Sequence, residues 1–221
     1  MSAFFVTATG TEIGKTYVSA QILRAAWKAG HEVAAVKPLM SGFAEEDLAA
    51  SDAGQLLAAM GKPVSAETID ALVAHRFAPA MAPNVAARRA GVVLDYEALV
   101  DFCRTRLLSD GLNLVEGAGG MMSPVTDDKL HTDLIADLGL PALLVSGNYL
   151  GTISHTLSAL AVLQARGCGV AAIAVSQVTP QDGDPLEIIP ELARWTDIPA
   201  FAIPHGADAE ELTAYLCAYR Q

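Results

Sequence analysis

Six short apolar runs alternate with longer stretches of helical spacing, and this alternation limits the folds open to the chain more than any other feature. The runs are rich in β-branched and aliphatic residues and occupy residues 4–9, 33–37, 112–116, 142–146, 170–176 and 200–203. The helical stretches occupy residues 15–28, 47–60, 95–108, 152–166, 185–195 and 208–219. Strands that alternate with helices pack as a parallel sheet. We therefore predict a doubly wound, mainly parallel α/β sheet with helices on both faces.

Composition agrees with a buried sheet and excludes other classes. Of the 221 residues 52% are hydrophobic and 18% charged, and no linker-like segment divides them, so we predict one domain spanning residues 1–221. The net charge of −11 at pH 7 would repel a phosphate backbone, so we expect no nucleic-acid partner. The first strand follows no basic leader, and no apolar run approaches the ~20 residues of a membrane span. We expect a cytoplasmic location and no membrane partner.

Cysteines and histidines show no metal-binding pattern. The three cysteines are far apart and form no CxxC pair, and the five histidines form no HxH or HExxH spacing. We interpret the thiols as buried or incidental and the histidines as structural or surface residues.

The first strand runs into Thr9-Gly-Thr-Glu-Ile-Gly-Lys-Thr16, where a helical pattern begins. Such a loop surrounds phosphates with backbone N–H groups, its Lys15 neutralises the β/γ charge, and its Thr16 hydroxyl ligates Mg²⁺. Thr9 stands where the motif has its first glycine, so an ordinary helix N-terminus is the alternative interpretation. The strand directly before the loop favours phosphate binding, and we predict a P-loop that binds ATP or GTP.

Further candidate residues follow predicted strands or stand at the start of predicted helices. Lys37 ends the second strand, where an α/β sheet presents ligand-binding groups, although a solvated lysine is the alternative. Glu116 ends the third strand before Gly117 and suits Mg²⁺, although a solvated Glu in a glycine-rich turn is the alternative. For Asp52, which follows Ser51 where a helical stretch opens, local chemistry alone favours a first-turn acid that stabilises the helix N-terminus. For Thr152 or Ser154 it favours a helix cap.

Five segments together resemble the ordered signature of the dethiobiotin synthetase family. They are residues 6–16, 37–42, 51–53, 115–120 and 150–155, and their order and spacing persist through most of the chain. The combined Thr-Glu-x-Gly-Lys-Thr, Lys-Pro-x-x-Ser-Gly and Val-Glu-Gly-Ala-Gly-Gly set is much more specific than a P-loop alone.

The resemblance implies an ATP- and Mg²⁺-dependent cyclo-ligase of the biotin pathway that makes dethiobiotin from 7,8-diaminononanoate (7,8-diaminopelargonate) and CO₂ or bicarbonate. One amine captures CO₂ as a carbamate, the carbamate takes the γ-phosphoryl group, and the second amine closes the ring with loss of phosphate. It also implies a homodimer with the substrate site at the subunit interface, where the loop matching residues 149–154 reaches the neighbouring subunit's substrate carboxylate.

Carried over position by position, the resemblance implies four sets of residues. The catalytic set is Thr11, Lys15 and Lys37, and the metal set is Thr16, Asp52 and Glu116. The substrate set is Thr11, Lys37, Ser41, Gly119, Leu150, Gly151 and Thr152. The nucleotide set is Glu12, Ile13, Gly14, Lys15, Thr16, Tyr17, Asp52, Glu116, Gly117, Ala118, Gly119, Ser176, Gln177, Pro204, His205, Gly206 and Glu211.

Two departures from the family pattern leave details open. Ala8 and Gly10 alter the glycine pattern of the loop, which concerns its shape. Ser176-Gln177 stands where many members carry the Asn-Asp that reads adenine, so the preference for a nucleotide base stays open.

Three alternatives compete with the synthetase interpretation. A ParA/MinD-like nucleotide switch needs a second lysine four residues before Gly14, where this chain has Gly10. The cobyrinate-amidating enzymes continue into a glutamine-hydrolysing domain, which we do not expect in a sequence that stops at Gln221. The third alternative is a nucleotide-binding protein without catalytic activity, in which Lys37, Ser41 and Glu116 would have no evident function.

The segment 62–94 resists assignment as helix or strand because Pro79 and Pro83 interrupt it. We expect it to be a surface excursion that helps to cover a ligand.

Overall fold

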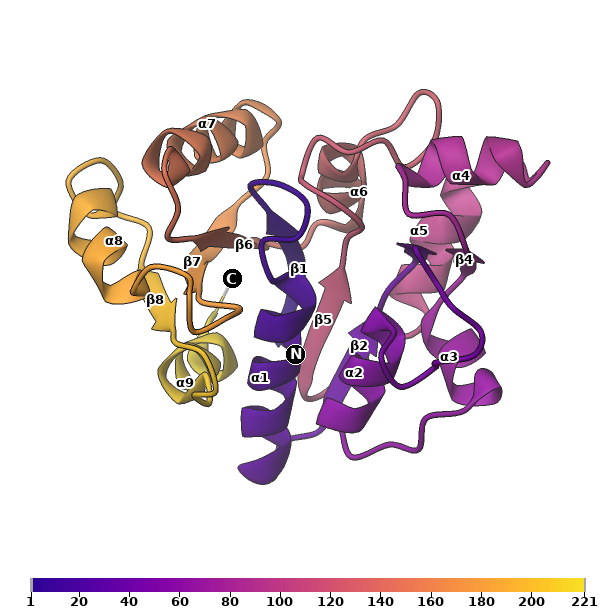
Figure 1. Cartoon of the computed structure of the whole chain (residues 1–221), viewed down its shortest axis with the longest axis horizontal. Helices are drawn as coiled ribbons and strands as arrows, with labels where there is room; N and C mark the ends of the chain where they lie inside the picture. The colour runs from indigo at the N-terminus through magenta and orange to yellow at the C-terminus, as the bar shows by residue number, and fades with distance from the viewer. Residues whose placement is uncertain (1, 221) are drawn as a thin grey trace.

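The central feature of the fold is a six-stranded sheet in the order β2-β5-β1-β6-β7-β8, in which every pairing is parallel (Figure 1). The computed structural model describes residues 2–220. The strands are β1 (Ser2–Ala8), β2 (Val33–Val36), β5 (Leu112–Glu116), β6 (Ala142–Gly147), β7 (Val170–Ser176) and β8 (Ala200–Ile203). The predicted parallel α/β sheet is therefore confirmed.

Helices cover both faces because side chains alternate along each buried strand. Phe4 and Leu143 point into one apolar layer, whereas their neighbours Phe5 and Leu144 point into the other. The first layer packs against α1 (Lys15–Lys28), α2 (Asp52–Ala59) and α9 (Glu210–Ala218). The second packs against α5 (Tyr96–Arg104), α6 (His131–Leu138), α7 (Thr152–Ala165) and α8 (Pro185–Leu192). In Figure 1 the sheet lies between α6 and α7 at the top and α1 and α9 at the bottom.

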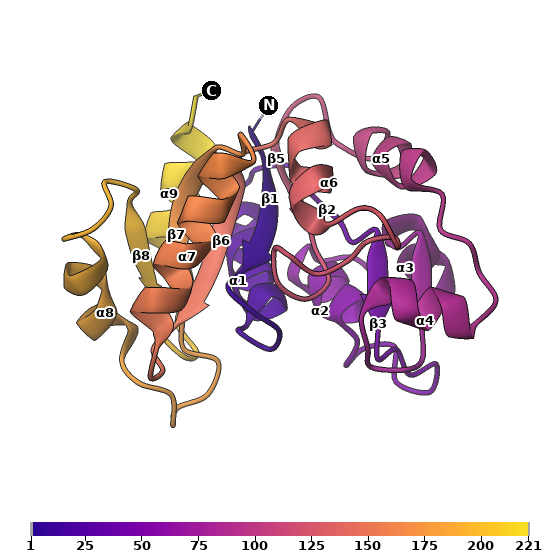
Figure 2. The same cartoon turned by 90° about the horizontal axis from the view of Figure 1, so that it is seen from above.

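Residues 39–51 and 60–94 form a separate group of elements beyond the β2 edge of the sheet, and α2 between them packs on α1 (Figure 2). A short parallel pair joins β3 (Leu39–Ser41) to β4 (His75–Phe77), and α3 (Ala66–Leu72) and α4 (Pro83–Arg89) flank it. Sequence periodicity assigned none of these elements, nor α6. The elements β3, β4, α3 and α4 have seven residues or fewer. A segment of about two helical turns or less is too short for its hydrophobic periodicity to be recognised.

Local chemistry explains why two of these short helices begin where they do. Ser65 and Thr68 form a reciprocal capping box at the start of α3. Pro83 is the first residue of α4, where the missing N–H costs nothing and the fixed φ is already helical. No helix within residues 2–220 is long and apolar enough to cross a membrane.

We predict that Leu144→Ala destabilises the protein by about 2–5 kcal/mol, because Leu144 is fully buried in a central strand and its truncation leaves a cavity. The matched control is Leu186→Ala on α8, where the side chain is 60% exposed and the change should stay within about 0.5 kcal/mol. Urea denaturation measures both. Equal losses in the two variants would contradict the assignment of β6 to the core.

Candidate active site

A cavity of about 690 Å³ opens at the edge of the sheet where β1, β2 and β5 end. Residues predicted from the sequence line much of it: Thr11, Glu12, Gly14, Lys15, Thr16, Tyr17, Lys37, Ser41, Asp52, Ala118 and Gly119. The sequence interpretation had not singled out the other lining residues: Met40, Gly42, Gln55, Ala80, Met81, Ala82, Pro83, Ser123 and Val178. The stretch 80–83 belongs to the segment that was expected to cover a ligand, and it does form one wall of this cavity.

The loop between β1 and α1 has the backbone shape of a phosphate cradle. Gly14 adopts φ 93° directly before α1, and Glu12 adopts φ 60°, which costs a non-glycine residue on the order of 1 kcal/mol. A Cβ on Gly14 would lie 2.5 Å from Val178 Cγ2 and 2.7 Å from Ser176 Oγ, so only glycine fits. Backbone hydrogen bonds from Thr9 N to Val145 O (3.0 Å) and Met121 N to Ala8 O (3.1 Å) anchor the loop and its neighbouring turn. The start of α1 therefore faces the cavity with its positive dipole end.

Lys37 is the centre of a buried charge cluster. Its ammonium lies 2.6 Å from Glu116 Oε1 and 2.7 Å from Asp52 Oδ2, and the Thr16 hydroxyl donates to Glu116 Oε1 at 2.7 Å. The side chains of Lys37 and Glu116 are only 2% and 1% exposed. Four residues that the sequence interpretation linked to phosphate and Mg²⁺ chemistry thus meet in one place.

Two opposing effects set the pKa values of this cluster: burial disfavours the charged form of each group, and a neighbouring opposite charge favours it. Burial alone would lower the pKa of Lys37, but Glu116 and Asp52 outweigh it and raise that pKa. Burial likewise opposes the Asp52 carboxylate, yet the charge of Lys37 prevails and lowers the pKa of Asp52. Lys15 is buried farther from these carboxylates, and desolvation lowers its pKa despite the attraction of Glu116. Lys37 therefore stays an ammonium at neutral pH.

Asp52 is an acid in the first turn of α2, as its local sequence predicted, but it is not the residue that caps the helix. Ser51 caps α2, since its Oγ accepts the Gly54 N–H at 3.0 Å, and this leaves the Asp52 carboxylate free to face Lys37. Thr152 is also not a cap: its Oγ1 donates to Gly147 O and lies 2.9 Å from Ser146 Oγ.

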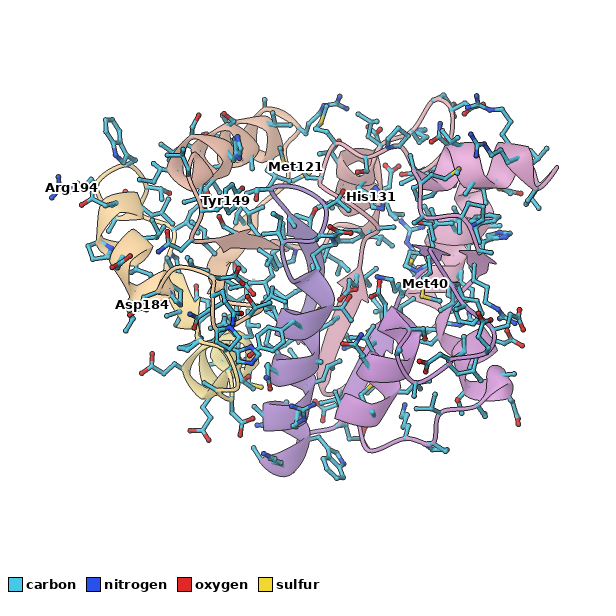
Figure 3. The ribbon with its side chains drawn as sticks, in the orientation of Figure 1. Met40, Met121, His131, Tyr149, Asp184 and Arg194 are labelled. Carbon is cyan, nitrogen blue, oxygen red and sulfur yellow. The ribbon has the colours of Figure 1, made fainter. Side chains whose placement is uncertain are left out.

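His131, the first residue of α6, lies beside the turn that follows β5 (Figure 3). Its side chain is 1% exposed, its Nε2 accepts the Ala118 N–H at 3.0 Å, and its Nδ1 lies 2.8 Å from Ser123 O. Burial and the positive charges of Lys15 and Lys37 lower the pKa of His131 to about 4. The sequence interpretation had treated this histidine as structural or superficial.

Three of the predicted nucleotide residues outside the cavity, Pro204, His205 and Gly206, gather around Tyr17. Its hydroxyl donates to Pro204 O (3.0 Å) and accepts the Gly206 N–H (2.8 Å), and its ring stacks on His205. Gln177 Oε1 accepts the His205 N–H at 3.0 Å, which joins the two base-side segments. Ile13 packs against the core below the loop, Gly117 lies buried beside His131, and Glu211 is exposed on α9.

Leu150, Gly151 and Thr152 lie at the start of α7 and do not line the cavity. Leu150 is fully exposed, and the Thr152 N–H donates to Tyr149 O at 3.0 Å. Tyr149 connects this loop to the phosphate loop, because its hydroxyl lies 3.2 Å from Thr9 Oγ1. Leu150 and Gly151 are therefore exposed, whereas Thr152 is only 2% exposed.

A parallel sheet with a phosphate-type loop after its first strand, and a lysine and two carboxylates around that loop, defines a P-loop nucleotide-binding protein of the α/β class. A family model described as an AAA domain matches residues 2–208. Curated relatives named ATP-dependent dethiobiotin synthetase occur in Phenylobacterium zucineum (45% identical, covering 100% of this chain and 97% of the relative) and Methylobacterium nodulans (41%, 93% and 94%). The chain belongs to the dethiobiotin synthetase family.

Solved structures confirm the fold alone. The MinC:MinD cell division protein complex of Aquifex aeolicus includes a chain that matches with a TM-score of 0.53 at 12% identity, covering 98% of this chain and 85% of that one. The signal recognition particle receptor FtsY of Elizabethkingia anophelis matches with a TM-score of 0.51 at 12% identity, covering 97% and 65%.

We predict that Glu116→Gln lowers the free energy of unfolding by about 1–3 kcal/mol, because buried Lys37 loses one of its two anionic partners. The control is Asp208→Asn, whose pair with Lys28 is exposed and contributes at most about 0.5 kcal/mol. Chemical denaturation at pH 7 without ligands measures both. A loss no greater for Glu116→Gln than for the control would show that the cluster does not stabilise the fold.

The lowered pKa of Asp52 predicts a specific acid dependence of stability. A carboxyl whose folded pKa lies below its unfolded value contributes stability above the unfolded value, and loses it as the pH falls through the folded pKa. The unfolding free energy of wild type should therefore fall more steeply below pH ~4 than that of Asp52→Asn, by at most about 1.4 kcal/mol per pH unit. Parallel curves from pH 5 to 2 would contradict this assignment.

Proposed function

We propose that this protein is an ATP-dependent dethiobiotin synthetase, which carboxylates 7,8-diaminononanoate and closes the ring to form dethiobiotin, ADP and phosphate. The observation that carries the proposal is the position of Lys37, a buried ammonium that lines the same cavity as the phosphate loop. Met40, Met81 and Pro83 also line this cavity and suit the aliphatic part of a substrate. Family membership supplies the identity of that substrate.

The site also fits Mg²⁺. Glu116 Oε2 is buried and has no hydrogen-bond partner among residues 2–220, and with Asp52 and the Thr16 hydroxyl it offers the hard oxygen atoms that Mg²⁺ takes. Residues 2–220 hold no cluster of three or more His, Cys, Asp or Glu side chains that could bind a metal by itself. We infer that Thr16, Asp52 and Glu116 hold Mg²⁺ together with the nucleotide phosphates. When bound, the ion neutralises charge on the β- and γ-phosphates.

The proposed reaction has three steps that balance. An amine nitrogen attacks CO₂ and loses a proton to give a carbamate; a carbamate oxygen then attacks the γ-phosphorus, and ADP leaves. The second amine attacks the carbonyl carbon of the carbamic-phosphoric anhydride, phosphate leaves, and the amine loses a proton.

Positioning and charge stabilisation are the tasks that remain for the protein in these steps. Lys37 stabilises the anionic carbamate and the transferring phosphoryl oxygens, since its raised pKa makes it an electrostatic group and not a proton acceptor. Lys15 and the N–H groups at the start of α1 hold the phosphates. Thr11, Ser41 and Gly119, which line the same cavity, contact the diamine and its carbamate.

A homodimer completes the proposed site. Leu150 and Gly151 are exposed outside their own cavity, which supports a role of this loop at the neighbouring subunit's substrate carboxylate. Thr152, the first residue of α7, is buried and holds the loop through its bonds to Gly147 O and Tyr149 O. On the base side, Pro204, His205 and Gly206 contact Tyr17, Gln177 bonds to His205, and Ser176 lies beside Gly14. The nucleotide base is proposed to bind beside these residues. Glu211 is the outermost member of that proposed set.

The first experiment measures phosphate release with Mg·ATP and bicarbonate, with and without 7,8-diaminononanoate, followed by mass analysis for dethiobiotin. We expect diamine-dependent release by wild type. Lys37→Met should reduce this turnover by about 10²-fold or more, because a charge-stabilising group is lost. ATP binding should persist.

The matched control is Lys62→Met, at an exposed position outside the cavity, which should change turnover by no more than about twofold. Circular dichroism establishes that both variants are folded. Phosphate release that ignores the diamine, with no cyclic urea formed, would exclude the synthetase function and favour a nucleotide switch.

A further inference from the structure

The turn after β5, residues 117–123, forms one wall of the cavity, and a buried histidine holds both of its ends. Ala118 and Ser123 both line the cavity, and His131 bonds to the backbone of each. The histidine lies on α6, behind this turn and away from the cavity lining (Figure 3). The proposed function gives it no task.

Hydrogen bonding determines the tautomer of the His131 ring. A backbone N–H can only donate, so Nε2, which faces the Ala118 N–H, must be unprotonated. The ring proton is therefore on Nδ1 and is donated to Ser123 O, which also accepts the His131 backbone N–H at 3.1 Å. The neutral imidazole thus satisfies a donor at one end of the turn and an acceptor at the other.

Steric contact adds to this constraint. A Cβ on Gly117 would lie 2.8 Å from His131 Cδ2 and 3.0 Å from Phe5 Cε1, so the imidazole and the Phe5 ring close around the backbone directly after Glu116. The same turn contacts the phosphate loop, because a Cβ on Gly120 would lie 3.2 Å from Gly10 Cα. A displacement of the turn would therefore also displace Gly119 and the phosphate loop.

We propose that His131 is a positioning residue for the diamine side of the active site. Its two hydrogen bonds fix the distance between Ala118 and Ser123, and so place Gly119 and the wall that the substrate contacts. The imidazole itself touches neither substrate nor nucleotide. This inference rests on the proposed function, because the diamine is the ligand whose binding reports on it.

Two substitutions separate the hydrogen bonds from the packing. His131→Phe keeps an aromatic ring against Phe5 but leaves the buried Ala118 N–H without its acceptor. His131→Gln keeps an amide that can accept from Ala118 and donate to Ser123. Leu163→Ala, at a fully buried position on α7 in the same apolar layer, controls for a general loss of stability.

The kinetic test is the KM for 7,8-diaminononanoate and for ATP, with kcat, below the unfolding transition of every variant. We expect His131→Phe to raise the KM for the diamine about tenfold and to change the KM for ATP by less than about threefold. His131→Gln should recover most of the loss. Leu163→Ala should lower stability and leave both KM values near those of wild type.

A second readout does not need activity. Amide hydrogen exchange of the ligand-free protein should show Ala118 protected in wild type and in His131→Gln, and at least about tenfold less protected in His131→Phe. This readout keeps the inference testable if wild type makes no dethiobiotin, which would instead reject the proposed function.

Two results would overturn the inference. One is unchanged Ala118 exchange and unchanged diamine KM in His131→Phe. The other is equal changes in diamine KM for His131→Phe, His131→Gln and Leu163→Ala, which would assign the effect to general destabilisation.

Discussion

The buried ammonium of Lys37 between Glu116 and Asp52 is the interaction on which the rest of the active site depends. A lysine that is 2% exposed stays charged only if anions surround it, and a carboxylate that is 1% exposed needs the same compensation. The charge of each group therefore offsets the free-energy cost of burying the others. Because Lys37 directly follows β2, Glu116 ends β5 and Asp52 begins α2, the cluster also joins three elements at the carboxyl edge of the sheet.

The cavity beside this cluster combines two kinds of lining. N–H groups at the start of α1 and Lys15 suit phosphate oxygens, whereas Met40, Met81 and Pro83 contribute apolar surface. A group transfer between a nucleotide and a small organic molecule needs these two environments side by side, with a fixed positive charge between them. The turn held by His131 also lines this cavity and contacts the phosphate loop.

Sequence patterns predicted the parts of the fold that repeat. All six strands of the sheet were recognised as short apolar runs and six of the helices by their 3.6-residue periodicity, and α1 begins and ends where expected, at Lys15 and Lys28. Within residues 39–94, α2 lies in the predicted helical stretch 47–60, but α3, α4, β3 and β4 were not assigned, because they are too short for periodicity. Asp52 illustrates the same limit for a site: its local sequence predicts an acid in the first turn of a helix, but not that its carboxylate pairs with Lys37, fifteen residues away.

The sequence by itself determined the class of fold and the phosphate loop. It also showed that Lys37, Asp52 and Glu116 are charged groups near strand or helix ends. Each of these features depends only on residues that are close together in the sequence. Only the tertiary structure decided that these three side chains touch, that residues 80–83 form a cavity wall, and that His131 holds the turn after β5. The physical reason is that local patterns specify which backbone conformation a segment adopts. The contacts between segments depend on burial and pairing across the whole sheet, which no segment encodes alone.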